Sequence, residues 1–139
     1  MMESQKKIGK DNNTSQAKWL KMELRIENET SVNDIQKQFN VYYPFLHLQF
    51  YRSMQLGNHH VQRIQKAHAD LPIKQLASIY GPMKLSIARD KTVAQLLTDF
   101  KAIGLIAQVS RKSGNLWVET SLTVDWTLDR QNKEAILIS

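Results

Sequence analysis

The stretch "MELRIENETSVNDIQKQFNVYYPFLHLQFYR", residues 22–52, decides the fold because its pattern returns as "MKLSIARDKTVAQLLTDFKAIGLIAQVSRKS", residues 83–113. At a constant offset of 61 residues, many apolar positions of the first stretch meet apolar positions of the second. The like pairs include Met22 and Met83, Leu24 and Leu85, Ile26 and Ile87, Phe39 and Phe100, and Leu48 and Val109. Such self-similarity indicates an internal repeat of one supersecondary unit.

Each repeat unit has the pattern strand, helix, strand. Apolar residues in 22–26 alternate with charged ones, which is the period of a half-buried strand. Ser31 in the first unit and Thr92 in the second are candidate helix N-caps, followed by apolar residues at helical spacing. Pro44 and Gly104 end the two helices, and a second alternating strand follows in each unit.

Two β-α-β units predict an α+β fold, with the ferredoxin-like sandwich as its simplest form. In that fold the helices cover one face of a single sheet and leave the other face open. A β-grasp-like arrangement is the alternative. Residues 1–17 are polar and are expected to form a disordered tail, so residues 18–139 form one α+β domain.

The connector between the units, residues 53–82, is too long for an unstructured link in a compact domain. We expect it to be partly helical. One short helix is expected around Val61 and Ile64, and a second turn or two between Pro72 and Tyr80.

The stretch after the second unit, "RKSGNLWVETSLTVDWTLDRQNKEA" (111–135), predicts a hairpin and a helix. A Ser113-Gly114 turn would pair Val109 with Val118 and give the added strand, residues 116–122, an apolar inner face. A loop at 114–115 would set Arg111 opposite Val118 and is disfavoured on that ground.

The last segment is expected to form a short helix that starts at Asp125 or Thr127, where an early acidic residue suits the helix dipole.

Composition limits the function classes. The chain of 139 residues has no cysteine, which excludes disulfides, thiolate nucleophiles and cysteine metal ligands. It has no apolar run of membrane-spanning length and no secretory signal pattern, so we expect a cytoplasmic protein without a membrane partner. The net charge of +6 comes mainly from residues 1–21 and from 53–91, where six basic side chains meet two acidic ones.

A resemblance to a known group of proteins rests on two parts of the sequence. One is the set of strings "RKSGNLWVET" (111–120), "WTL" (126–128) and "QN" (131–132), and the other is the pattern of residues 22–52. They resemble a group of small uncharacterised proteins from Bacteroidetes-type bacteria that end in a similar hairpin and helix. The likeness covers roughly residues 22–52 and 83–134. It implies a shared fold and brings no assigned activity and no catalytic residue.

No motif in the sequence predicts catalysis, a cofactor or a metal. A nucleophile elbow, a P-loop and a dinucleotide fingerprint are all absent from the sequence. His59, His60 and His68 have no metal-ligand spacing and no acidic cluster beside them. We therefore expect a non-enzymatic protein without a cofactor or bound metal.

The alternation of the strands predicts one candidate binding surface on the open sheet face. Aromatic, amide and cationic side chains of this kind grip peptides or stack on bases. The residues are Arg25, His47, Gln49, Tyr51, Lys84, Gln108, Ser110, Lys112 and Trp117. The competing interpretation is that the terminal helix covers Trp117 and Tyr51 through Trp126 and Leu128.

These observations favour a small interaction module that binds a protein, itself or another, through the open face or an edge strand. The alternative is a nucleic-acid-binding domain that uses the same face, supported by Arg25, Lys84, Lys112 and the basic connector.

Overall fold

A computed structural model describes residues 21–53 and 63–138 of the chain. Within these residues the fold is α+β, as predicted, with three α-helices and two antiparallel sheets. The elements in chain order are β1 (Glu23–Ile26), α2 (Val32–Tyr42), β2 (Leu46–Ser53), β3 (Arg63–Lys66), the 3-10 helix η1 (Ile73–Gln75), β4 (Met83–Ser86), α3 (Val93–Ala102), β5 (Ile106–Ser113), β6 (Leu116–Glu119), the 3-10 helix η2 (Ser121–Thr123) and α4 (Leu128–Ile138).

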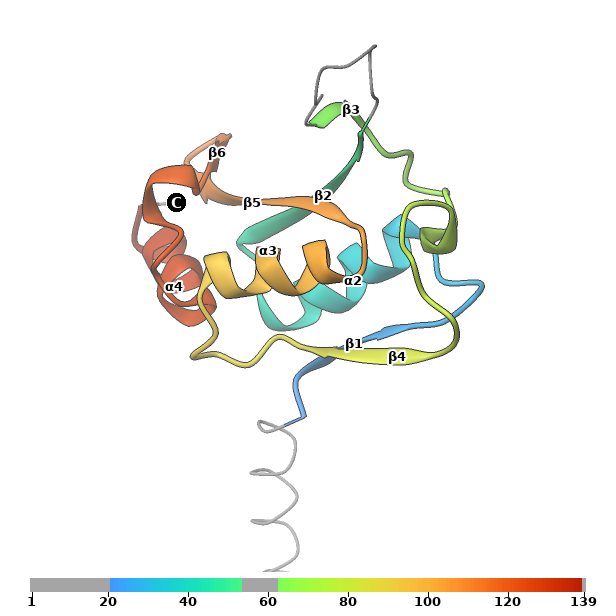
Figure 1. The fold of residues 1–139 in the computed structure, drawn as a ribbon. Coiled ribbons are helices and arrows are strands. Elements are labelled where there is room, and N and C mark those ends of the chain that lie inside the picture. The colour runs from blue at the N-terminus through green and yellow to red at the C-terminus, as the bar shows by residue number, and fades with distance from the viewer. Residues whose placement is uncertain (1–20, 54–62, 139) are drawn as a thin grey trace, which may run out of the picture.

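The strands form two sheets, which corrects the prediction of a single sheet. β1 pairs with β4 in a two-stranded ribbon, and the larger sheet has the order β3-β2-β5-β6. In Figure 1 the helices α2 and α3 lie between the ribbon and the larger sheet. The two strands of the first unit therefore belong to different sheets, β1 to the ribbon and β2 to the larger sheet, and α2 contacts both of them from its place between the layers.

The core lies between these layers. The predicted inward residues of the strands, Leu24 and Ile26 on β1 and Leu48 on β2, are fully buried. The helix positions Ile35, Phe39, Leu96 and Phe100 are buried as well. Phe100 meets Phe50 edge to face, with ring centroids 5.1 Å apart. A contiguous apolar cluster of this kind is what stabilises a chain of this size.

Both predicted helix caps are confirmed. The Ser31 hydroxyl accepts a hydrogen bond from the Asp34 N–H, and the Asp34 carboxylate accepts one from the Ser31 N–H. The same capping box joins Thr92 and Gln95 at the start of α3. The bond from the Ser31 N–H lowers the pKa of Asp34 below its ordinary value.

The connector is less helical than predicted. Ile64 lies in β3, which pairs with β2, and not in a helix. The expected turn after Pro72 is present as η1, whose Ile73 is buried in the core. Residue Val61 and the expected tail, residues 1–17, lie outside the described residues.

The hairpin between β5 and β6 adopts the register that the sequence disfavoured. Ser113 lies opposite Leu116, and Arg111 lies opposite Val118. The loop residues are therefore 114–115, and Gly114 has a φ of +62°. A positive φ at the first central position is the requirement of a type II′ turn, which glycine meets without strain. Local turn geometry therefore set the register here, and it leaves Val118 exposed.

Helix α4 begins after Thr127, one of the two predicted starts, with the Thr127 hydroxyl accepting from the Arg130 N–H. Leu128 is fully buried. Buried Gln131 donates to the Thr123 carbonyl and accepts from Arg111 at 2.8 Å. The Asn132 side chain accepts from the Phe45 N–H at 3.0 Å. The conspicuous C-terminal motif therefore fixes the helix to the sheet.

None of the helices in the described parts of the chain is both long and apolar enough to cross a membrane.

Candidate binding surface

The structure divides the predicted surface between two places. Arg25 and Lys84 lie opposite each other on the β1/β4 ribbon. The remaining residues lie on the larger sheet, on the face opposite the buried positions Leu48 and Val109. We call this the outer face, and its predicted members are His47, Gln49, Tyr51, Gln108, Ser110, Lys112 and Trp117.

The outer face carries two pairs of an aromatic and a cationic side chain. Tyr51 on β2 lies opposite Lys66 on β3, and Lys112 on β5 lies opposite Trp117 on β6. His47 contacts the Trp117 ring at a centroid distance of 5.6 Å. Directly opposed side chains on one face are close enough to interact. The face therefore combines ring surfaces with positive charge at both ends.

The amides on this face are engaged locally. The Gln108 side chain donates to the Glu119 carboxylate at 3.2 Å and to the Ser121 hydroxyl at 3.3 Å. Gln49 donates to the Phe50 carbonyl. Because these amides already have protein partners, the aromatic and cationic groups are the better candidates for contact with a ligand.

Trp117 is not covered by the terminal helix, which corrects the competing interpretation of the sequence. Half of its surface, 50%, is exposed. Leu128 is buried in the core, and the Trp126 ring lies against the guanidinium groups of Arg130 and Arg111, at 3.8 and 5.3 Å. Trp126 and Leu128 therefore help to attach α4 to the rest of the fold, and they leave Trp117 exposed.

Strand β6 is the most exposed apolar element that the structure describes. All four of its residues are exposed, with Leu116 at 70%, Trp117 at 50% and Val118 at 44%. Leu122 on the adjoining η2 is 97% exposed. Contiguous apolar side chains on a protein surface mark contact sites.

The backbone of β6 also presents an edge that no described strand covers. Within residues 21–53 and 63–138, β6 is the last strand of its sheet and pairs with β5 on one side only. The Lys112 N–H donates to the Phe45 carbonyl, toward β2, so Lys112 and Trp117 form a pair without mutual hydrogen bonds. The Trp117 N–H and C=O consequently point outward, where a further strand could pair with them.

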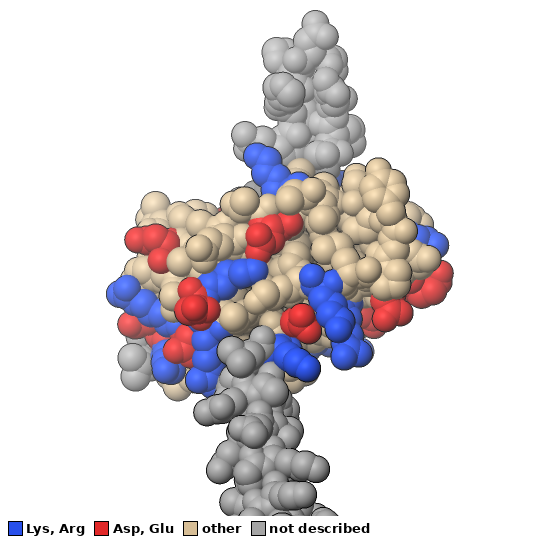
Figure 2. All heavy atoms as spheres, turned by 60° about the horizontal axis from the view of Figure 1, so that its bottom comes forward, with Lys and Arg blue, Asp and Glu red and all other residues tan. Residues whose placement is uncertain are grey.

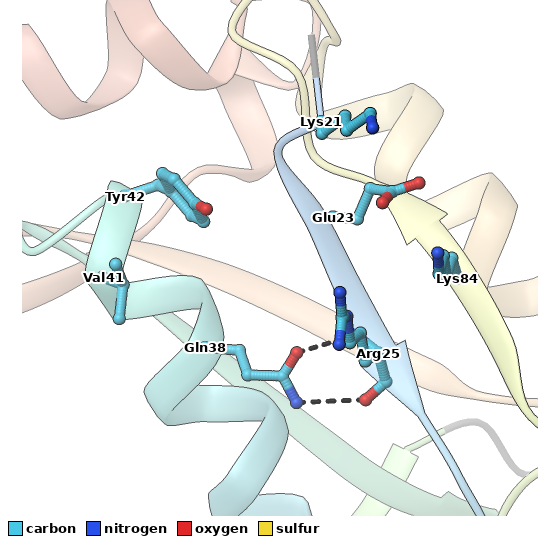
Figure 3. A pocket seen from close by; sticks show the side chains of 7 residues that line it. All are labelled: Lys21, Glu23, Arg25, Gln38, Val41, Tyr42 and Lys84. Carbon is cyan, nitrogen blue, oxygen red and sulfur yellow. Dashed lines mark hydrogen bonds between the residues drawn. The ribbon is translucent and has the colours of Figure 1, made fainter. Parts of the chain in front are cut away.

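Arg25 and Lys84 line a different feature, a groove of about 510 Å³ between β1 and α2. Figure 3 shows Gln38 reaching from α2 to β1, where its amide accepts from the Arg25 N–H at 2.7 Å and donates to the Arg25 carbonyl at 3.0 Å. The other lining residues are Lys21, Glu23, Val41 and Tyr42.

The charges around this groove are mixed. Figure 2 shows basic and acidic side chains interspersed on the side of the molecule that carries the β1/β4 ribbon. Opposite charges that alternate in this way do not build the single-sign field that concentrates a charged ligand. The groove is therefore a weaker candidate than the outer face and β6.

No group of three His, Asp or Glu side chains within residues 21–53 and 63–138 is arranged to hold a metal ion. His68 is exposed near the end of β3, and His59 and His60 lie outside the described residues.

Sequence reasoning missed Leu116, Val118 and Leu122, because it placed Val118 inside. The dipeptide Gly114-Asn115 was the available signal, since glycine followed by asparagine is typical of a primed hairpin turn. That turn would have set the observed register, in which Val118 lies opposite Arg111.

The fold and the surface together define a small α+β protein with an exposed apolar strand at a sheet edge. Comparison with protein-family models, with curated proteins and with solved structures gives no match to this chain.

Proposed function

We propose that this chain is a small, non-enzymatic, cytoplasmic interaction module that binds an extended strand of a protein at β6. The observation that carries the proposal is the exposure of Leu116, Trp117 and Val118 on a strand whose outer backbone groups face away from the sheet. Addition of a strand to such an edge supplies main-chain hydrogen bonds, and alternate side chains supply specificity.

Protection of the other edges supports this choice of strand. The outer edge of β1 is occupied by the Gln38 amide, and on β4 the Lys91 ammonium donates to the Ser86 carbonyl. β3 carries the exposed Lys66 and pairs with β2 through a register shift between Arg52 and Ser53. Lysines, bulges and covering groups are the usual protection against unwanted pairing. β6 has a regular register and no lysine.

Site-specific photo-crosslinking tests this proposal. A photoreactive amino acid in place of Leu116 is expected to cross-link the chain to a protein in cells of its source. The same group in place of Val41, which is 74% exposed on α2, is the matched control and is expected to give no such product. Equal cross-linking from both positions, or none from position 116, would refute the proposal.

A second candidate function is nucleic-acid binding at the outer face. It is favoured by the two opposed pairs, Tyr51 with Lys66 and Trp117 with Lys112, which place rings beside cations. Stacking on aromatic rings with nearby positive charge is how many proteins bind single strands. A binding titration with mixed RNA and DNA decides this, because binding must weaken steeply with added salt. Absence of binding at low ionic strength removes this candidate.

We further propose that the chain is a tandem repeat of one unit, larger than β-α-β. The strand pairing supports such a repeat, because equivalent residues of the two units lie opposite each other. Leu24 lies opposite Leu85 and Leu48 lies opposite Val109, and the residues of each pair are 61 positions apart. A second likeness, at an offset of 55, relates residues 69–73 to residues 124–128. The same hydrogen bond occurs in both halves. The Val32 N–H donates to the Leu71 carbonyl, and the Val93 N–H, 61 residues later, donates to the Trp126 carbonyl, 55 residues after Leu71.

A further inference from the structure

We propose that the strand received by β6 is β6 of a second copy of this chain, paired antiparallel about a two-fold axis. This inference rests on the proposed function of β6 and names its partner. The pairing would join two four-stranded sheets into one continuous sheet. A two-fold interface requires a self-complementary surface, in which each residue meets a suitable residue of the same strand.

The backbone geometry limits the register of this pairing. The outward-facing residues of β6 alternate along the strand and include Trp117. Hydrogen-bonded pairs must join outward-facing residues of both copies. The symmetric registers that stay within the strand are therefore centred on Trp117 or on Val118.

The side chains favour the register centred on Trp117. It places Leu116 opposite Val118 of the second copy, twice by symmetry, and sets the two Trp117 rings beside each other on the outer face. The register centred on Val118 would instead set Trp117 opposite Glu119. It would also set Leu116 opposite Thr120, which is buried and bonded to the Val109 carbonyl.

The charge of the strand favours an antiparallel second copy. Glu119 is the single charged residue of β6 and lies at one end of it. In the register centred on Trp117 it meets Asn115 of the other copy, so the two carboxylates are kept apart. Parallel pairing of two copies would place the carboxylates side by side, which is destabilising. The strand is therefore complementary to itself in one orientation.

The first test is the mass of the full chain in solution, measured by light scattering and sedimentation over a range of concentrations. Wild-type protein is expected to form a dimer. Leu116→Lys and Val118→Lys are expected to raise the dimer dissociation constant about tenfold or more, because each variant brings two charges into the interface. Val41→Lys is the matched control and is expected to dimerise like the wild type.

Loss of folding would not explain a monomeric variant, because Leu116 and Val118 are exposed in the single chain. The circular dichroism spectrum of each lysine variant is expected to match that of the wild type. A dimer that persists in both lysine variants would overturn the proposal.

The second test uses the absence of cysteine from the chain. Leu116→Cys and Val118→Cys are prepared separately, oxidised alone and oxidised as a mixture. The mixture is expected to cross-link, because these positions face each other in a close pair without hydrogen bonds, with a Cα separation of roughly 4.5 Å. Cross-linking of Val118→Cys alone as efficient as that of the mixture would overturn the register.

Failure of this inference can be told apart from failure of the proposed function. If the wild type stays monomeric at every concentration while the Leu116 photo-crosslink captures a different protein, the self-pairing is refuted and the strand-binding function remains. If the wild type is monomeric and the crosslink captures nothing, both proposals are refuted.

Discussion

Two buried polar side chains, Tyr43 and Gln131, connect elements that are distant in the sequence. The Tyr43 hydroxyl, at the end of α2, donates to the Ile87 carbonyl just after β4 at 2.7 Å. Gln131 joins α4 to β5 through Arg111. A buried polar group is stabilising only when it is bonded, so each of these bonds fixes one arrangement of the layers.

Tyr43→Phe is expected to destabilise the fold by roughly 1–2 kcal/mol, because it leaves the Ile87 carbonyl buried without its partner. Urea unfolding measures the change. Tyr42→Phe, on the neighbouring half-buried residue, is the control and is expected to have little effect. Equal losses in the two variants would contradict the role assigned to this hydrogen bond.

Asp34 is expected to make the stability of the fold depend on pH on the acidic side. Its pKa is lowered by the hydrogen bond from the Ser31 N–H, so the folded state favours the carboxylate. That contribution is complete above the pKa of the unfolded chain, about 4, and is lost as the pH falls through the lower pKa of the folded chain.

Urea unfolding of wild type and Asp34→Asn across this pH range checks the expectation. The wild type is expected to be the more stable at neutral pH, with the difference shrinking below about pH 4. A difference that stays constant down to the lowest pH would contradict the contribution of the Asp34 carboxylate.

The hairpin that presents β6 depends on Gly114. Its φ of +62° is costly for a residue with a side chain, so Gly114→Ala is expected to destabilise the fold by about 1 kcal/mol. Gly81→Ala is the control, because a Cβ there meets nothing within 4 Å and its φ is not positive. Thermal unfolding compares the two variants, and equal melting temperatures would contradict the type II′ turn.

The helices and their caps could be predicted from the sequence because they depend on local patterns. The capping boxes at Ser31 and Thr92 and the apolar stripes behind them lie within a few residues of each other. The hairpin register could not be predicted by strand parity. The predicted and the observed registers differ by two residues, so both place Val118 on the same face of the sheet and parity cannot choose between them.

The local sequence pattern could not predict which strands share a sheet either. The alternation in residues 22–26 predicts a strand with a buried face and does not say which strand lies beside it. The candidate surface shows the consequence. Parity placed seven of its nine predicted residues together on the outer face, while Arg25 and Lys84 lie on the separate ribbon formed by β1 and β4.

The molecule as a whole is held together by pairing between its two halves. β1 pairs with β4 and β2 pairs with β5, so both sheets cross the boundary between the units. A protease site inserted between Tyr80, which is fully exposed, and Gly81 is expected to give a cleaved protein whose two pieces stay associated. Gel filtration after cleavage measures this. Separation of the pieces without denaturant would contradict the account.

We propose that the outer edge of β6 receives a strand. Hydrogen exchange of the Trp117 amide tests it most directly, because this N–H points away from β5. Exchange is measured in dilute protein, in concentrated protein and in extract of the source cells. We expect fast exchange in dilute protein and marked slowing in at least one of the other two conditions. Equally fast exchange in all three would contradict it.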